Sequence, residues 1–295
     1  MNSTAETEDS AVCNEELTML KRIITGICII AALIPIIIFS NTWLFPIVMA
    51  IISVLCVYEL SNCMGLKRNV PLLAPLYLFG AAFPFLQRIL DNIIDVAIIA
   101  IMAVIFYVSY LFCFAIFSHD KITYPDICTL GLTAFYILFS INMMIYLRDY
   151  NGYIAFLILV GSWVTDAMAY FTGRLFGKHK LAPEVSPKKT IEGSIGGTVF
   201  CALAFVLTGV IVDAIADGVS PNYIYLAISG LIIAVISQAG DLIMSVIKRH
   251  YKIKDFGNLF PGHGGMLDRM DSVFSVTLGI QTLIMFTHLT GISLF

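Results

Sequence analysis

The sequence predicts an all-α polytopic membrane protein with about nine transmembrane helices and a cytoplasmic N-terminus. Three observations support this fold class: composition, the length of the apolar segments and the placement of the basic residues. Of the 295 residues, 59% are hydrophobic and 13% are charged, whereas soluble domains carry about 25% charged residues. Mean hydropathy is +0.91. A soluble globular domain is therefore excluded.

Apolar segments of the length that a membrane requires recur along the chain. A hydrocarbon core of about 30 Å needs roughly 20 residues per helix. The segments that meet this criterion are 22–40, 42–60, 71–88, 92–117, 127–147, 153–173, 194–213, 222–247 and 272–291. Pro71, Pro75 and Pro84 interrupt the third segment, so we expect it to be kinked or partly re-entrant.

Lysine and arginine are distributed asymmetrically between the two sides that nine spans define. Fifteen of the 17 fall on the side of the N-terminus: Lys21, Arg22, Lys67, Arg68, Lys121, Arg174, Lys178, Lys180, Lys188, Lys189, Lys248, Arg249, Lys252, Lys254 and Arg269. Only Arg88 and Arg148 fall on the other side. Because cytoplasmic loops are enriched in basic residues, this split predicts a cytoplasmic N-terminus and an external C-terminus.

The chain divides into three parts by polarity. Residues 1–20 are polar and acidic, without the basic n-region or cleavage site of a signal peptide. We expect them to form a cytoplasmic tail. Residues 21–150 are nearly featureless anchor helices, and residues 151–295 carry all the polar motifs of a catalytic transmembrane region. The seven cysteines form no CxxC, which argues against zinc and a disulfide framework, and no arginine-rich stripe indicates nucleic-acid binding.

The first motif, Ser162–Lys180, places small and polar residues on one helical face. Ser162, Asp166, Ala169, Tyr170 and Gly173 recur at helical spacing. Such a face packs closely against a neighbouring helix or lines a wet cavity. Both readings stay open for this motif, and Asp166 lies deep enough in the span to need a partner.

The second motif reads SPKKTIEGSIGG, from Ser186 to Gly197. We expect Ser186 to cap a helix whose first residue is Pro187. Lys188 and Lys189 would then lie in the first turn beside free backbone amides, where an anion could bind. The glycines allow a ligand or another backbone to come close. A basic loop that follows the positive-inside rule is the alternative.

The third and fourth motifs place acids and bases together between 238 and 272. Gln238, Asp241, Ser245, Lys248 and Arg249 share one stripe of a helix. Further on, a tight loop, PGHGG, precedes three polar residues that share a face at the start of the last span; they are Asp268, Asp271 and Ser272. Charges next to lipid cost about 2.5–3.5 kcal/mol each, so these residues indicate function. Carboxylates beside fixed cations indicate a divalent metal with phosphate.

Together these residues closely resemble the signature of the phosphatidate cytidylyltransferases, the CDP-diacylglycerol synthases. The signature S-x-x-K-R, K-D, P-G-H-G-G and D-R-x-D-S is matched by Ser245, Lys248, Arg249, Lys254, Asp255, Pro261 to Gly265, Asp268, Arg269, Asp271 and Ser272. The element S-P-K-K-T-x-E-G-x-x-G-G is matched by 186–197, and D-x-x-A-Y-x-x-G-R by 166–174. One departure is Met244, where bacterial members often carry a glutamate before the signature serine.

The resemblance implies a reaction in which CTP and phosphatidic acid give CDP-diacylglycerol and pyrophosphate. On this basis Asp241 and Asp268 are candidate ligands of a catalytic Mg²⁺, supported by Asp271 and Asp166, with a second cation such as K⁺ as an option. Lys188 and Lys189 would neutralise the triphosphate. Further candidate substrate-binding residues are Ser186, Thr190, Glu192, Lys248, Arg249, His263, Gly264, Gly265 and Arg269.

The resemblance also implies a place in the cell and an assembly. We expect an integral protein of a bacterial plasma membrane, with its active site facing the cytoplasm, where CTP is. The family suggests a homodimer. Asp166 or Asp271 would supply the ligand or proton acceptor in place of the carboxylate absent at Met244.

Several other functions compete with this one. A CDP-archaeol synthase or a dolichol-kinase-like protein would act on a different lipid. A CDP-alcohol phosphatidyltransferase would carry an acidic run that is absent here. A secondary transporter would place polar groups in both halves of the chain, and a structural scaffold would not need the acids.

Overall fold

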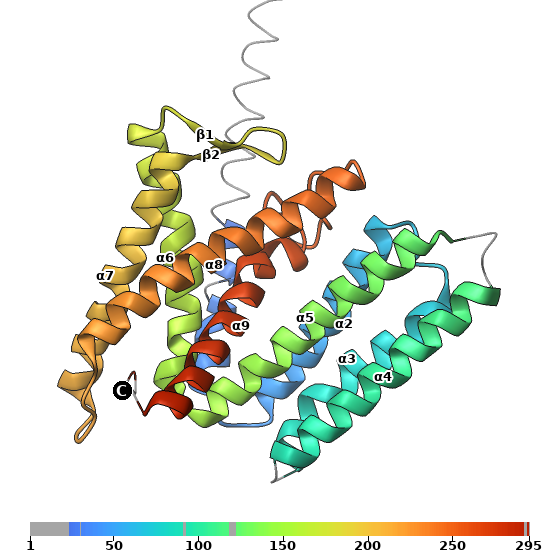
Figure 1. Ribbon diagram of the computed structural model, residues 1–295, viewed down its shortest axis with the longest axis horizontal. Helices are drawn as coiled ribbons and strands as arrows, with labels where there is room; N and C mark the ends of the chain where they lie inside the picture. The colour runs from blue at the N-terminus through green and yellow to red at the C-terminus, as the bar shows by residue number, and fades with distance from the viewer. Residues whose placement is uncertain (1–23, 30, 91–92, 118–121, 292–293, 295) are drawn as a thin grey trace, which may run out of the picture.

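The computed structural model describes residues 24–29, 31–90, 93–117, 122–291 and 294, so the predicted tail 1–20 lies outside the described residues. Long helices and one short hairpin make up the described chain (Figure 1). The helices are α2 (Leu44–Cys63), α3 (Val70–Ile89), α4 (Ile93–Phe117), α5 (Tyr124–Tyr150), α6 (Gly152–Phe176), α7 (Ile191–Ile215), α8 (Tyr223–His250) and α9 (Leu267–Thr290). Strands β1 (Lys180–Ala182) and β2 (Ser186–Thr190) pair antiparallel between α6 and α7.

Within the described ranges, eight helices are long and apolar enough to cross a membrane. The prediction of an all-α polytopic membrane protein is thereby confirmed. The first predicted span, 22–40, and the basic residues Lys21, Arg22 and Lys121 lie partly or wholly outside the described residues, although 24–29 and 31–38 are helical. The count of nine spans and the cytoplasmic N-terminus stay predictions.

The described helices pack around two apolar cores. One is built mainly from α2, α3 and α5, and the other mainly from α6, α7, α8 and α9. Helix α9 contributes to both cores, through Phe274 to the first and through Val276 to the second. It therefore joins the two halves of the molecule, and it begins directly after the PGHGG loop.

Helix α3 runs without interruption through Pro75 and Pro84, so the re-entrant form of our prediction is wrong. Pro75 has no N–H and leaves the carbonyl of Pro71, four residues earlier, without its helical partner. The hydroxyl of Tyr110 on α4 donates to that carbonyl over 2.6 Å. A side chain from the neighbouring helix thus supplies the bond that the proline removes.

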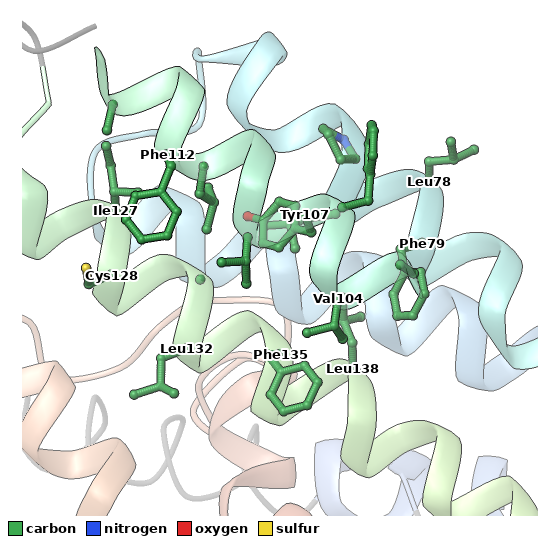
Figure 2. A pocket seen from close by; sticks show the side chains of 18 of the residues that line it. Leu78, Phe79, Val104, Tyr107, Phe112, Ile127, Cys128, Leu132, Phe135 and Leu138 are labelled. Carbon is green, nitrogen blue, oxygen red and sulfur yellow. The ribbon is translucent and has the colours of Figure 1, made fainter. Parts of the chain in front are cut away.

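An apolar cavity of about 630 Å³ lies between α3, α4 and α5 (Figure 2). Phe79, Phe135 and Leu138 line it, together with Tyr107, whose hydroxyl is buried without a hydrogen-bond partner in the described part of the chain. Among the described residues, no charged side chain lines this cavity. None of the predicted site residues reaches it, so the site has to lie elsewhere.

The predicted helix start at Ser186 is wrong. Ser186–Thr190 forms β2, and α7 begins at Ile191 with Thr190 as its cap, whose hydroxyl accepts from the amide of Gly193 over 3.1 Å. Lys188 and Lys189 therefore lie in a strand rather than in a first helical turn. Pairing with β1 draws this segment into a hairpin, and a two-stranded sheet leaves an open edge where a proline such as Pro187 is tolerated.

Glycines allow α6 and α7 to pack against each other. A Cβ atom at Gly193 would lie 2.6 Å from the carbonyl oxygen of Ala169, and one at Gly197 would lie 2.8 Å from that of Thr165. Small residues that let backbones approach this closely are typical of helix interfaces in membranes. The glycines were predicted to admit either a ligand or another backbone, and here they admit the backbone of α6. This packing places the hairpin beside α6.

Candidate active site

Asp268 forms an enclosed charge pair in the predicted site. Helix α9 begins at Leu267, earlier than predicted, so Asp268 lies in its first turn. One carboxylate oxygen accepts from the ammonium of Lys248 over 2.9 Å, and the other accepts from the amides of Phe256 and Gly265 over 2.8 and 2.9 Å. The two charged side chains are 3% and 10% exposed. The two charges therefore neutralise each other inside the protein, with little contact to water.

The segment Phe256–Leu267, here called the signature loop, owes its shape to two glycines. Gly262 and Gly264 adopt φ of 77° and 82°, which residues with a Cβ rarely adopt. The amide of Phe260 donates to the carbonyl of Gly264 over 2.9 Å and closes the turn. This turn brings Gly265 to Asp268. His263 in the turn has a buried Nδ1 with no hydrogen-bond partner among the described residues.

A carboxylate from the anchor region also reaches this loop. Glu59 of α2 is 5% exposed and accepts from the amides of Met266 and Leu267 over 2.9 and 2.8 Å. A cavity of about 500 Å³ opens beside it, lined in part by Asp255 and Phe256. Glu59 is not among the residues predicted from the sequence. A lone acid within the apolar span 42–60 was the signal that could have identified it.

Asp241 lies on the accessible side of the same site. It pairs with Lys189 of β2 over 2.6 Å, and the two side chains are 26% and 23% exposed. On the same stripe of α8, Ser245 donates to Asp241 over 3.4 Å. One turn earlier, Gln238 donates to the carbonyl of Ser194 on α7. The predicted polar stripe of α8 therefore faces β2, α7 and α9 in turn.

Asp166 joins the site through a chain of two hydroxyl groups. Ser272 of α9 donates to Asp166 over 2.9 Å, and Ser162 lies 2.7 Å from Ser272. Because the single hydrogen of Ser272 points to Asp166, Ser162 is the donor in the second bond. Asp166 interacts electrostatically with Asp241 and Asp271. Carboxylates of α6, α8 and α9 thus gather at one place, with Lys189 beside them.

These acids fit a hard cation by their chemistry, since Mg²⁺ takes oxygen ligands and keeps several waters or phosphate oxygens. Among the described residues, no group of three or more His, Cys, Asp or Glu side chains has the arrangement of a formed metal site. Asp268 already accepts three hydrogen bonds. Asp241 is more accessible, and Asp166 and Asp271 are near it. The metal ligands stay a prediction, with Asp241 more accessible than Asp268.

Of the remaining predicted residues, some side chains form hydrogen bonds within the described part of the protein and others do not. Glu192 accepts from the amides of Lys178 and His179, and its carboxylate lies 2.7 Å from Nδ1 of the His179 ring, which holds the hairpin against α7. Arg249 donates to the carbonyls of Val185 and Ile253. The exposed or half-exposed residues without such bonds in the described chain are Ser186, Lys188 and Arg269. Lys188 and Arg269 are therefore available to an anionic ligand.

Fold and site together define an integral membrane protein whose helices α6, α8 and α9, with the hairpin, bring acids and lysines into one site. Comparison with known proteins agrees. The model of the cytidylyltransferase family matches residues 20–287. The chain is 33% identical over 267 residues to a phosphatidate cytidylyltransferase of Bacillus subtilis, covering 88% of this chain and 94% of the relative.

Two further relatives carry the same name. That of Staphylococcus haemolyticus is 33% identical over 264 residues, covering 88% of this chain and 96% of the relative. That of Rickettsia prowazekii is 40% identical over 156 residues, covering 52% and 68%. The chain belongs to the phosphatidate cytidylyltransferase family. It is thus an enzyme of the nucleotidyltransferase type, which sets aside the transporter and scaffold alternatives.

Proposed function

We propose that this protein transfers the cytidylyl group of CTP to phosphatidate, giving CDP-diacylglycerol and pyrophosphate. The observation that carries the proposal is that α8 contributes to two lysine–aspartate pairs. Asp241 of α8 pairs with Lys189 of β2, and Lys248 of α8 pairs with Asp268 of α9. The family relationship supports the same reaction. Residues from three parts of the signature are needed to build these pairs.

The proposed reaction is a displacement at the α-phosphorus of CTP. An oxygen of the lipid phosphate forms the new P–O bond, and the bond between the α-phosphorus and the bridging oxygen to the β-phosphate breaks. The electron pair leaves with pyrophosphate. Because the lipid phosphate is already anionic, the reaction depends on alignment and charge neutralisation more than on proton removal.

The chain's own residues would divide these tasks. Lys189 would turn from Asp241 to the triphosphate, and Lys188 and Arg269 would contact phosphate oxygens from the surface. Lys248 and Asp268 would keep the signature loop in place. Asp241, with Asp166 and Asp271, would hold a Mg²⁺ ion, which supplies charge neutralisation at the phosphates.

The site would face the cytoplasm, where CTP is available, in a bacterial plasma membrane. The excess of basic residues on the side of the signature supports this orientation. A homodimer and a second cation such as K⁺ remain part of the proposal, on the family resemblance alone.

The test uses purified protein in vesicles, with labelled CTP and a choice of acceptor lipids. With phosphatidate and Mg²⁺ we expect labelled cytidine in the lipid fraction and an equal amount of pyrophosphate. EDTA should abolish both products, and added Mg²⁺ should restore them. Product with dolichol or an ether lipid but none with phosphatidate would contradict the proposed acceptor.

A further inference from the structure

Glu59 occupies an unusual position between the two halves of the molecule. It lies near the C-terminal end of α2, and its two oxygens accept from Met266 and Leu267, more than 200 residues away. Helix α9 begins at Leu267, and its N-cap residue, Met266, provides no side-chain cap. Free amides at a helix start are usually satisfied by a local side chain. Here a carboxylate of a distant helix serves instead.

No cation neutralises this buried carboxylate within the described chain, where the ion pairs join other residues. Its charge is balanced by two backbone donors at the positive end of the α9 dipole. Hydrogen bonds to a charged acceptor are stronger than neutral ones. The start of α9 is therefore fixed to α2 in both position and direction.

The same stretch of backbone holds Asp268. Three consecutive amides are divided between two carboxylates: Gly265 donates to Asp268, and Met266 and Leu267 donate to Glu59. A shift of the loop at Glu59 would therefore move the donor of Asp268, and with it the contact to Lys248. Glu59 is therefore linked to Asp268 through the backbone of the signature loop.

Two glycines make room for this carboxylate. A Cβ atom at Gly257 would lie 2.4 Å from one oxygen of Glu59, and one at Gly265 would lie 2.3 Å from the other. Real Cβ atoms do not approach so closely, so a side chain at either position would displace Glu59. At Gly257 the three nearest atoms all belong to Glu59, which makes Gly257 a specific probe of this contact.

We propose that Glu59 is a positioning residue for cytidylyl transfer, which fixes the signature loop and the start of α9 so that Asp268 and Lys248 keep their geometry. The inference rests on the proposed function. It assigns a role in the reaction to a helix, α2, that otherwise serves as an anchor.

The first experiment compares Glu59→Gln with Glu184→Gln, a change of the same chemistry at an exposed residue of the hairpin turn. Glutamine keeps the size of the side chain but turns one acceptor into a donor that faces a backbone N–H. We expect kcat to fall about tenfold or more, where each tenfold corresponds to about 1.36 kcal/mol in the barrier. Glu184→Gln should keep the wild-type kcat.

Hydrogen–deuterium exchange provides a readout that does not depend on the reaction. In Glu59→Gln, peptides that contain the amides of Met266 and Leu267 should exchange faster, while those of α7 should not change. If the wild type makes no product and exchange still responds, the proposed function fails and the contact stands. Wild-type kcat and wild-type exchange in Glu59→Gln would overturn the inference.

A double-mutant cycle with Gly257→Ala tests whether the effect passes through this contact. Gly257→Ala should lower kcat by displacing Glu59. In the double variant the loss should equal that of the stronger single variant, because coupled residues are not additive. Losses that multiply in the double variant would show two independent effects and would also overturn the inference. If Glu59→Gln is poorly expressed, Gly257→Ala alone still tests the contact. Hydrogen–deuterium exchange at Met266 that stays at the wild-type rate in Gly257→Ala would contradict the contact.

Discussion

The half built from α2 to α5 and the half built from α6 to α9 bury polar groups in different ways. In the first half, several buried side chains bond to their own helix, as Ser53 does to Met49 and Asn142 to Leu138, and the cavity is lined almost wholly by apolar residues. Ion pairs across elements occur in both halves. In the first half Arg88 of α3 pairs with Asp149 of α5 near the C-terminal ends of these helices, whereas in the second half Lys189 pairs with Asp241 beside the carboxylates of Asp166 and Asp271. Contacts within one helix need no partner element, whereas the contacts around Asp241 hold a site together.

The candidate site residues and the apolar anchor helices are separated along the chain but not in space. Glu59 crosses from the first half to the start of α9, and the hydroxyl of Tyr136 on α5 contacts that of Ser275 on α9. Both contacts lie where α9 passes between the two cores. The anchor half therefore supports the site from one side, and the substitutions below should affect the two halves to different degrees.

The largest effect is expected from Lys248→Met, in the second half. It leaves Asp268 as a buried charge without its cation, and breaking such a pair typically costs about 3–5 kcal/mol. We expect both activity and thermal stability in detergent to fall sharply. The double variant Lys248→Met/Asp268→Asn removes the unpaired charge and should recover stability without activity. A single variant as stable as the wild type would show that the pair is not enclosed as described.

A second, more selective effect is expected from Lys189→Met. The Lys189–Asp241 pair is less enclosed than Lys248–Asp268, with side chains 23% and 26% exposed, so the loss of stability should be smaller than in Lys248→Met. Loss of a group that neutralises developing charge should lower kcat about 10²-fold or more. Lys67→Met, at an exposed lysine between α2 and α3, is the matched control. Equal kcat values for the two variants would remove Lys189 from the mechanism.

Ser272→Ala should have a moderate effect. The change removes the donor to Asp166 and the acceptor of Ser162, and a typical buried hydrogen bond is worth about 0.5–1.5 kcal/mol. We expect a loss of activity of about three- to tenfold, measured as initial rate. Ser229→Ala is the control, because the Ser229 hydroxyl is buried without a partner in the described chain. The same loss in both variants would argue against a role for the Asp166 contact.

The smallest effect is expected from Leu132→Ala, at the apolar cavity of the first half. Leu132 is 75% exposed, and substitutions at such surface positions usually change stability by less than about 0.5 kcal/mol. Initial rates in vesicles should stay within about twofold of the wild type. A loss comparable to that of Ser272→Ala would show that this cavity takes part in the reaction, and the separation of the two halves would then be wrong.

Much of the fold and site could be predicted because it follows from local pattern. The length of apolar segments predicted the spans, and the period of α8 placed Asp241 and Lys248 on one stripe. The pairing of each acid could not be predicted, because Lys189–Asp241 and Lys248–Asp268 depend on how a strand and two helices approach. Ser186 and Thr190 are both suitable caps, and pairing with β1 decided between them. Glu59 was missed because its partners are so distant in sequence.

The most direct test of the central claim follows two labels of CTP in vesicles that contain phosphatidate. With CTP labelled at the α-phosphate, the lipid fraction should gain label; with CTP labelled at the γ-phosphate, the label should leave as pyrophosphate. Asp241→Asn should abolish the transfer of the α-label while the protein remains folded by its thermal transition. A γ-label in the lipid, or full transfer by Asp241→Asn, would contradict cytidylyl transfer at this site.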